Sequence, residues 1–158
     1  MGMSTETEEL FSAALSARLA RGTTGGLPSG TIVLTMDGEM PVEHLAPGDR
    51  IVTREGGMAR IREIRVLRQR IAPVRVRAGT FGHARPGEDT LLSPATRVHL
   101  RDWRARALYG AATADMPAGR LVDGTFVLRE AAREMRLHDV VLDRPQTLYA
   151  GGLELRSA

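Results

Sequence analysis

The chain has 158 residues, no cysteine and a formal net charge of +3, and all 22 of its basic side chains are arginine. This length is typical of one domain with a short extension, and the absence of cysteine excludes disulfides, thiolate metal sites and a thiol nucleophile. The 19 acidic residues are interspersed with the arginines, so no dedicated basic face is indicated and we do not expect nucleic acid as a partner.

Two further features of composition bear on location and ligands. No apolar run approaches the roughly 18 residues that cross a bilayer, and the acidic N-terminus MGMSTETEEL lacks the basic start of a secretory signal. We therefore expect no membrane association and a cytoplasmic location. We take a coding bias towards GC-rich codons as the explanation for the use of arginine in place of all lysine. The functional alternative is an anion- or nucleic-acid-binding surface, because guanidinium groups suit phosphates.

The first predicted element is a helix over residues 5–21. Thr5 and Glu8 have capping-box spacing, and Gly22 is a natural end. An apolar stripe along the helix is formed by Leu10, Phe11, Ala14, Leu15 and Leu19. Residues 1–26 are therefore expected to be a helical arm with a Gly-rich linker, which packs on its own domain or contacts a protein partner that the sequence does not identify, in an oligomeric state it does not reveal.

The next stretch, residues 27–51, predicts short strands joined by tight turns. Asp37-Gly38 lies between extended segments and predicts a type I′ hairpin turn, in which both central residues have positive φ. Pro47-Gly48 predicts a second turn, with proline fixing φ and glycine taking the left-handed position. Ile51 and Val52 begin another strand.

Short strands continue to the end of the chain and predict an all-β domain over residues 27–155, with a tail at 156–158. Within residues 103–110 we expect Trp103 and Tyr109 to cover the core. The other predicted strands lie within 58–70, where one or two strands carry a kink, and at 73–77, 90–94, 97–100, 137–142 and 147–149.

Four groups of motifs resemble one known family in order and separation. They are Gly30-Thr31 with Asp37-Gly38, Pro41-Val42-Glu43 and Pro47-Gly48-Asp49; Asp89 to Pro94 with Arg97-Val98; Met116-Pro117-Ala118 with Leu121 to Gly124; and His138 with Asp143-Arg144 and Ala150-Gly151-Gly152. Together they resemble the bacterial branch of Hint domains, the fold shared by inteins and hedgehog autoprocessing domains. The resemblance implies an all-β, horseshoe-like fold and a domain that cuts its own chain.

The residues that carry the family's reaction are replaced in this sequence. In active members a nucleophile, usually cysteine, lies four residues before the glycine of the Gly-Thr pair, which is the position of Gly26 here. The histidine that protonates the departing amide corresponds to Thr96, and the asparagine that completes intein splicing has no counterpart because the chain contains none. We therefore expect a degenerate, non-catalytic Hint-like domain that acts as a scaffold or interaction module. Four histidines without paired spacing indicate no metal site, and we expect no cofactor.

The alternative is self-cleavage by a displaced hydroxyl. Ser29 lies near the lost nucleophile and could form an ester by an N-to-O acyl shift, given a base and an oxyanion stabiliser. His138 with Asp143 is the candidate base pair, and Ser93 is a further residual polar candidate. His99 is expected to face elsewhere unless the strand register slips. A hydroxyl within hydrogen-bonding reach of an imidazole in this cleft would overturn the expectation of a silent domain.

Overall fold

The computed structural model describes residues 25–158, and its strands form three antiparallel sheets. The predicted all-β class is therefore confirmed, while the predicted N-terminal helix lies outside the described residues. The largest sheet has the order β10 (Ala114–Pro117), β9 (Arg97–Leu100), β14 (Leu153–Arg156), β13 (Thr147–Ala150), β2 (Ile32–Thr35), β4 (Arg50–Thr53) and β5 (Gly57–Arg60), with β3 (Gly38–Pro41) paired to β2. The other sheets are β1 (Leu27–Pro28), β12 (Arg133–Val141) and β6 (Glu63–Ile71), and β11 (Val127–Arg129), β7 (Val74–Val76) and β8 (Thr90–Leu92).

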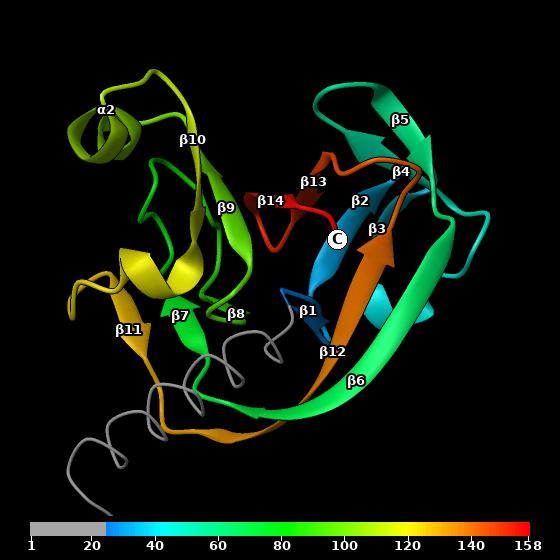
Figure 1. Cartoon of the computed structure of the whole chain (residues 1–158), viewed down its shortest axis with the longest axis horizontal. Helices are drawn as coiled ribbons and strands as arrows, with labels where there is room; N and C mark the ends of the chain where they lie inside the picture. Colours follow the sequence, from blue (N-terminus) through cyan, green and yellow to red (C-terminus); the bar gives the residue numbers. More distant parts are fainter. Residues whose placement is uncertain (1–24) are drawn as a thin grey trace, which may run out of the picture.

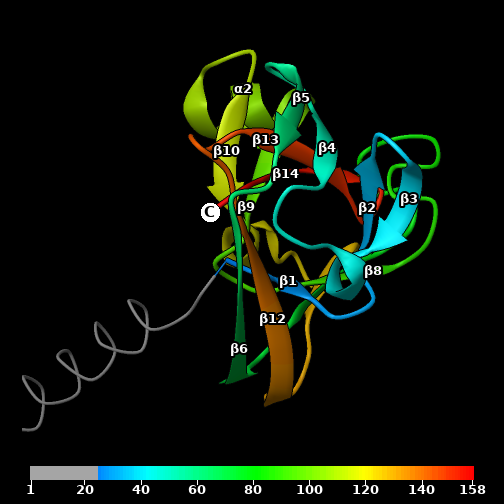
Figure 2. The same cartoon turned by 90° about the vertical axis from the view of Figure 1, so that its right-hand side faces the viewer.

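The horseshoe shape comes from one long two-stranded ribbon. Strands β6 and β12 each span nine residues and pair along their whole length, from Glu63 opposite Val141 to Ile71 opposite Arg133. In Figure 1 the ribbon curves along the lower edge and joins a lobe carrying β7 to β11 to a lobe carrying β2 to β5. Figure 2 shows the two strands side by side from the perpendicular direction. The ribbon thus brings β12 beneath the short strand β1.

The core is built from branched aliphatic side chains on alternating strand positions. In β7, Val74 and Val76 are fully buried while Arg75 between them is partly exposed, as strand alternation predicts. Strands β2 and β4 bury Val33 and Ile51 in the same way. Among the described residues every buried hydrophobic side chain of the core cluster is aliphatic or methionine, and the aromatic Phe81 packs against this cluster while partly buried.

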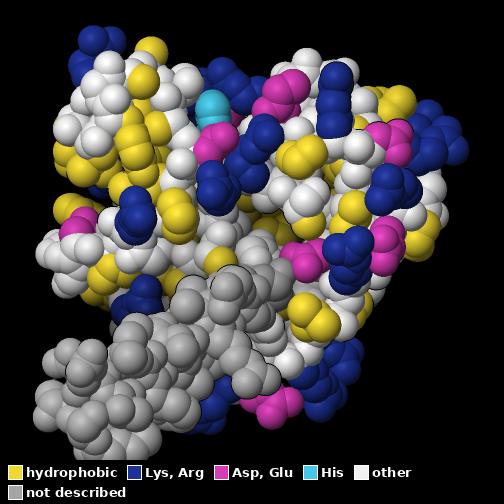
Figure 3. Space-filling view, in the orientation of Figure 1, with side chains coloured by type: hydrophobic (Ala, Val, Ile, Leu, Met, Phe, Trp, Pro, Cys, Tyr) yellow, Lys and Arg dark blue, Asp and Glu magenta, His cyan; other side chains and the backbone are white. Residues whose placement is uncertain are grey.

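The expectation that Trp103 and Tyr109 cover the core is wrong. Residues 103–109 form the short helix α2 (Trp103–Tyr109), which Asp102 caps by accepting a hydrogen bond from the backbone N–H of Arg104 at 3.1 Å. Trp103 is 69% exposed and Tyr109 is 46% exposed, because Ala105 is the helix residue that faces the core. Figure 3 shows hydrophobic side chains gathered on the surface over α2 and β10.

Of the two turns predicted for residues 27–51, one forms as expected and one is displaced. Asp49 N–H donates to the carbonyl of Ala46 at 3.1 Å and Gly48 has φ +93°, which confirms the Pro47-Gly48 turn. In the first hairpin, however, Thr35 pairs with Gly38, so the loop is Met36-Asp37 and Gly38 follows it at φ +101°. Asp37 has no positive φ. The type I′ prediction is therefore wrong, and the hairpin instead places a left-handed glycine after its turn.

The C-terminal residues are bonded to the domain. The boundary expected at residue 155 falls inside β14, and the backbone N–H groups of Ser157 and Ala158 donate to Gln146 and Val140. Two 3-10 turns, η1 (Val42–His44) and η2 (Ala118–Leu121), complete the elements. Within residues 25–158 the helices are too short to cross a membrane.

Candidate functional site

Strand β1 brings the start of the described chain against β12. Leu27 pairs with His138 and Pro28 with Leu137, and Leu27 is buried in the core. This pairing sets Gly26, at the position of the family's nucleophile, beside the peptide that joins His138 to Asp139. The strand therefore assembles residues that lie more than a hundred positions apart in the sequence.

Gly26 lies in a tight space beside strand β12. A Cβ atom built there would lie 2.9 Å from Asp139 Oδ1, 3.1 Å from the carbonyl carbon of His138 and 3.2 Å from the nitrogen of Asp139. The first neighbour is the end of a side chain, whereas the other two are backbone atoms that would have to shift by a few tenths of an ångström. The position therefore lacks a nucleophilic side chain and is crowded for one.

Thr96, at the position of the family's histidine, contacts the carbonyl group that precedes Gly26. Its Oγ1 donates to the carbonyl oxygen of Gly25 at 3.0 Å, and its side chain is fully buried. The turn that presents it is closed by the Thr96 N–H donating to the carbonyl of Ser93 at 3.0 Å. Ser93 is fully buried too, and its Oγ accepts from the Ala95 N–H at 3.3 Å. Gly25 and Gly26 therefore lie between this turn and strand β12.

Ser29 and His138 form a hydroxyl–imidazole pair. Ser29 Oγ lies 2.9 Å from His138 Nε2, with the tautomer deciding which group donates. Ser29 occupies the second position of a β-turn that begins at Pro28, in which Gly30 has φ +92° and the Thr31 N–H donates to the Pro28 carbonyl at 3.1 Å. This contact meets the condition stated above for overturning the expectation of a fully silent domain, so that expectation is limited to the family's cleavage position at Gly26.

Burial makes His138 a neutral imidazole at pH 7. Its side chain is almost fully buried, and this desolvation lowers its pKa, with Glu43 opposing the effect and Arg136 adding to it. The acidic neighbour is thus Glu43, whose Oε2 accepts the Gly30 N–H at 2.7 Å, a bond that lowers the pKa of Glu43. Asp143 is exposed, and within residues 25–158 no hydrogen bond or ion pair joins it to His138. The His138–Asp143 pairing expected from the sequence does not form.

The sequence analysis missed the residue that polarises the carbonyl next to Ser29. The Pro28 carbonyl oxygen accepts two hydrogen bonds from Thr31, from the backbone N–H at 3.1 Å and from Oγ1 at 2.8 Å. Donors of this kind stabilise the oxyanion of a tetrahedral intermediate. The Thr31 position was part of the recognised Gly-Thr motif, which is the signal that could have pointed to it.

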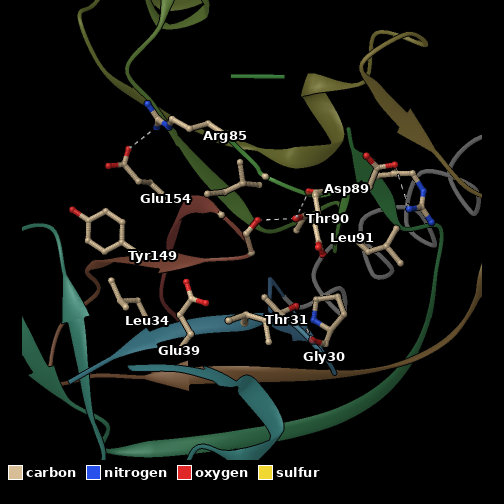
Figure 4. A pocket seen from close by; sticks show the side chains of 18 of the residues that line it. Gly30, Thr31, Leu34, Glu39, Arg85, Asp89, Thr90, Leu91, Tyr149 and Glu154 are labelled. Atoms are coloured by element: carbon tan, nitrogen blue, oxygen red, sulfur yellow. Dashed lines mark hydrogen bonds and ion pairs between the residues drawn. The ribbon is translucent and has the colours of Figure 1, made fainter. Parts of the chain in front are cut away.

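Ser29 opens onto a groove of about 790 Å³ between the lobes. Figure 4 shows Leu34 and Glu39 on one side of the groove, with Arg85, Thr90 and Glu154 on the other. Within the described part of the chain no cluster of three His, Asp or Glu side chains is placed to hold a metal ion.

The comparisons with known proteins agree with this fold. A family model described as "Hint domain" matches residues 26–158. The chain is similar to the solution structure of a bacterial intein-like domain from Clostridium thermocellum, at 13% identity and a TM-score of 0.56, over 86% of this chain and 100% of that one. It is also similar to the crystal structure of the gp41-1 intein, at 11% identity and a TM-score of 0.55, over 86% of this chain and 100% of that one. A third similar structure is that of the MchDnaB-1 intein, at 15% identity and a TM-score of 0.53, over 84% of this chain and 99% of that one. No curated protein matches.

Proposed function

The chain belongs to the Hint domain family, and we propose that it is a member that does not cleave itself at the family's position and serves as a scaffold or interaction module. The observation that carries this proposal is the absence of a side chain at Gly26, in a crowded position where a Cβ would lie 2.9 Å from Asp139 Oδ1. Without a nucleophile the Gly25 carbonyl cannot be attacked from this position. The proposed partner of such a module is another protein.

The contact of Thr96 with Gly25 supports the same proposal. A threonine hydroxyl has a pKa far above neutrality, so Thr96 cannot protonate a departing amide at pH 7. It donates instead to the Gly25 carbonyl at 3.0 Å. The position of the family's acid thus holds the peptide in place.

A second candidate function, self-cleavage between Pro28 and Ser29, is favoured by the Ser29–His138 contact. In this reaction Ser29 Oγ attacks the Pro28 carbonyl carbon, and His138 Nε2 accepts the hydroxyl proton and returns it to the Ser29 nitrogen as the C–N bond breaks. The product is an ester between Pro28 and Ser29 Oγ. Water then releases a Pro28 carboxylate and restores the Ser29 hydroxyl. The two Thr31 donors on the Pro28 oxygen would stabilise the intermediate.

Two observations weigh against this second candidate. The leaving nitrogen of Ser29 donates to the Arg136 carbonyl at 3.1 Å as part of the sheet, so departure of this nitrogen from its place would break a hydrogen bond of the sheet. The contacts of Pro28 with Thr31 are also those of an ordinary β-turn. We therefore keep the non-cleaving module as the conclusion.

A time course of intact mass on the purified full chain separates the candidates. We expect one species of unchanged mass, with or without hydroxylamine or added thiol. Scission between Pro28 and Ser29 that disappears in Ser29→Ala and slows in His138→Gln would establish the second candidate. Scission between Gly25 and Gly26 would contradict the proposal directly.

A further inference from the structure

A buried carboxylate at one end of the groove is surrounded by three arginines. Glu154 is 4% exposed and contacts Arg54 Nη1 at 3.0 Å, Arg101 Nε at 2.8 Å and Arg85 Nη2 at 3.5 Å. Burial would raise the pKa of Glu154, but the bonds from Arg101 and Arg54 bring it below its ordinary value. The carboxylate is therefore ionised at neutral pH, and the cluster carries more positive than negative charge.

Arg85 and Arg101 retain unused hydrogen-bond donors. Within residues 25–158, Glu154 is the acceptor that each of these two guanidinium groups binds, through a single nitrogen. Both side chains are partly exposed and line the groove. A guanidinium with free N–H groups and an uncompensated charge matches an oxyanion in shape and sign.

A second polar group without a partner lies beside the same arginines. His99 Nδ1 bonds Asp115 Oδ1 at 2.7 Å, while its Nε2 is buried and has no hydrogen-bond partner among the described residues. His99 lines a small cavity of about 90 Å³ together with Arg85, Arg101 and Glu154. The small cavity and the groove share Arg85, Arg101 and Glu154, so an unsatisfied imidazole nitrogen lies in the cavity next to this end of the groove.

The other residues that line the groove indicate which kind of anionic ligand it would accept. Glu39, Glu88 and Asp89 also line it, and their charges disfavour a dianion such as phosphate. Leu34, Leu91 and Tyr149 offer apolar surface to the body of a ligand. We propose that the groove binds a monoanionic carboxylate ligand, with its carboxylate held by Arg85 and Arg101 beside Glu154 and its apolar part against Leu34 and Leu91. This site is independent of whether the chain cleaves itself.

Calorimetric titration of the full chain with a matched pair of probes tests the chemistry. N-acetyl-leucine carries a carboxylate and an apolar body, while N-acetyl-leucinamide differs by lacking the charge. We expect binding of the acid, no measurable binding of the amide, and weaker binding of inorganic phosphate. Equal binding of acid and amide, tighter binding of phosphate, or no binding of the acid would overturn the proposal.

Three variants test the position of the site. Arg85→Gln is expected to weaken binding of N-acetyl-leucine about tenfold, the value of one charged hydrogen bond. Arg75→Gln removes the same charge from the same groove, but Arg75 is already paired with Glu130 and Asp89, so binding is expected to change less than about twofold. Glu154→Gln removes the competing carboxylate and is expected to strengthen binding.

The pair of arginine variants decides the outcome even if Glu154→Gln does not fold. Equal effects of Arg85→Gln and Arg75→Gln would indicate general attraction by charge and overturn the assigned position. A folded Glu154→Gln chain, checked by circular dichroism, that binds more weakly would overturn it as well.

Discussion

Thr96 Oγ1 donates a 3.0 Å hydrogen bond to the carbonyl oxygen of Gly25, which joins the position of the family's catalytic histidine to the peptide that active members cleave. A fully buried hydroxyl thus takes the place of a proton donor. The contact stabilises the entry of the chain into β1 and supplies no acid–base chemistry at neutral pH. Thr96 therefore has a structural role at the position where the resemblance to the family leads us to expect a histidine.

Removal of this hydroxyl is expected to destabilise the fold. Thr96→Val keeps the shape but deprives the Gly25 carbonyl of its donor, at a cost of about 1 kcal/mol in the free energy of unfolding. Thr96→Ser retains the hydroxyl donor, so its free energy of unfolding should decrease less than that of Thr96→Val. Urea unfolding measures both, with Thr125→Val as an exposed control. Equal stability of the valine and wild-type chains would show that the bond contributes nothing.

A side chain at position 26 is expected to lower the free energy of unfolding, even when it is as small as a methyl group. Gly26→Ala forces a Cβ against Asp139 and the His138 backbone, and we expect a loss of about 1–2 kcal/mol. The control is Gly87→Ala, because a Cβ at Gly87 meets its nearest neighbour at 3.9 Å. Thermal unfolding of both variants provides the measurement. A Gly26→Ala chain as stable as the wild type would show that the position accommodates a side chain without strain.

The buried His138 predicts a pH dependence of stability. Its pKa in the folded chain lies below the unfolded value of about 6.5, so the unfolded chain binds more protons between the two values. The contribution of His138 to the free energy of unfolding should therefore be complete above a pH of about 6.5. It should decrease as the pH falls from there toward the pKa of the folded chain. Unfolding midpoints between pH 5 and 7.5 test this, and His138→Gln should flatten the profile in that window. An unchanged slope in the variant would assign the effect to other groups.

Trp103 is expected to contribute little to stability. It is 69% exposed and stacks under Arg104, whose guanidinium carbon lies 4.7 Å from the ring centroid. Trp103→Ala should therefore cost about 1 kcal/mol or less, whereas Leu100→Ala, at a position 1% exposed, should cost about 2–5 kcal/mol. Trp103 is the chain's one tryptophan, so the tryptophan fluorescence measures its exposure directly. We expect iodide to quench this fluorescence readily. Strong protection from iodide would place it in the core after all.

Local sequence patterns predicted much of the fold. Alternation along 73–77 and the Pro47-Gly48 turn depend on neighbouring residues, and both were confirmed. The displaced first hairpin and helix α2 were missed because tertiary packing chose among conformations that short-range propensity leaves close in energy. Burial of Trp103 was predicted from its residue type, yet Ala105 faces the core instead.

By itself the sequence determined that this chain is an all-β member of the Hint family without a side chain at Gly26 or an imidazole at Thr96, because those features depend on residue identity and order. The tertiary structure alone decided that Ser29 lies against His138, that Glu43 rather than Asp143 acts on that imidazole, and that Arg85 and Arg101 share Glu154. Such contacts join strands from distant parts of the chain. Their distances depend on sheet register and on the curvature of the β6–β12 ribbon, which no local spacing specifies.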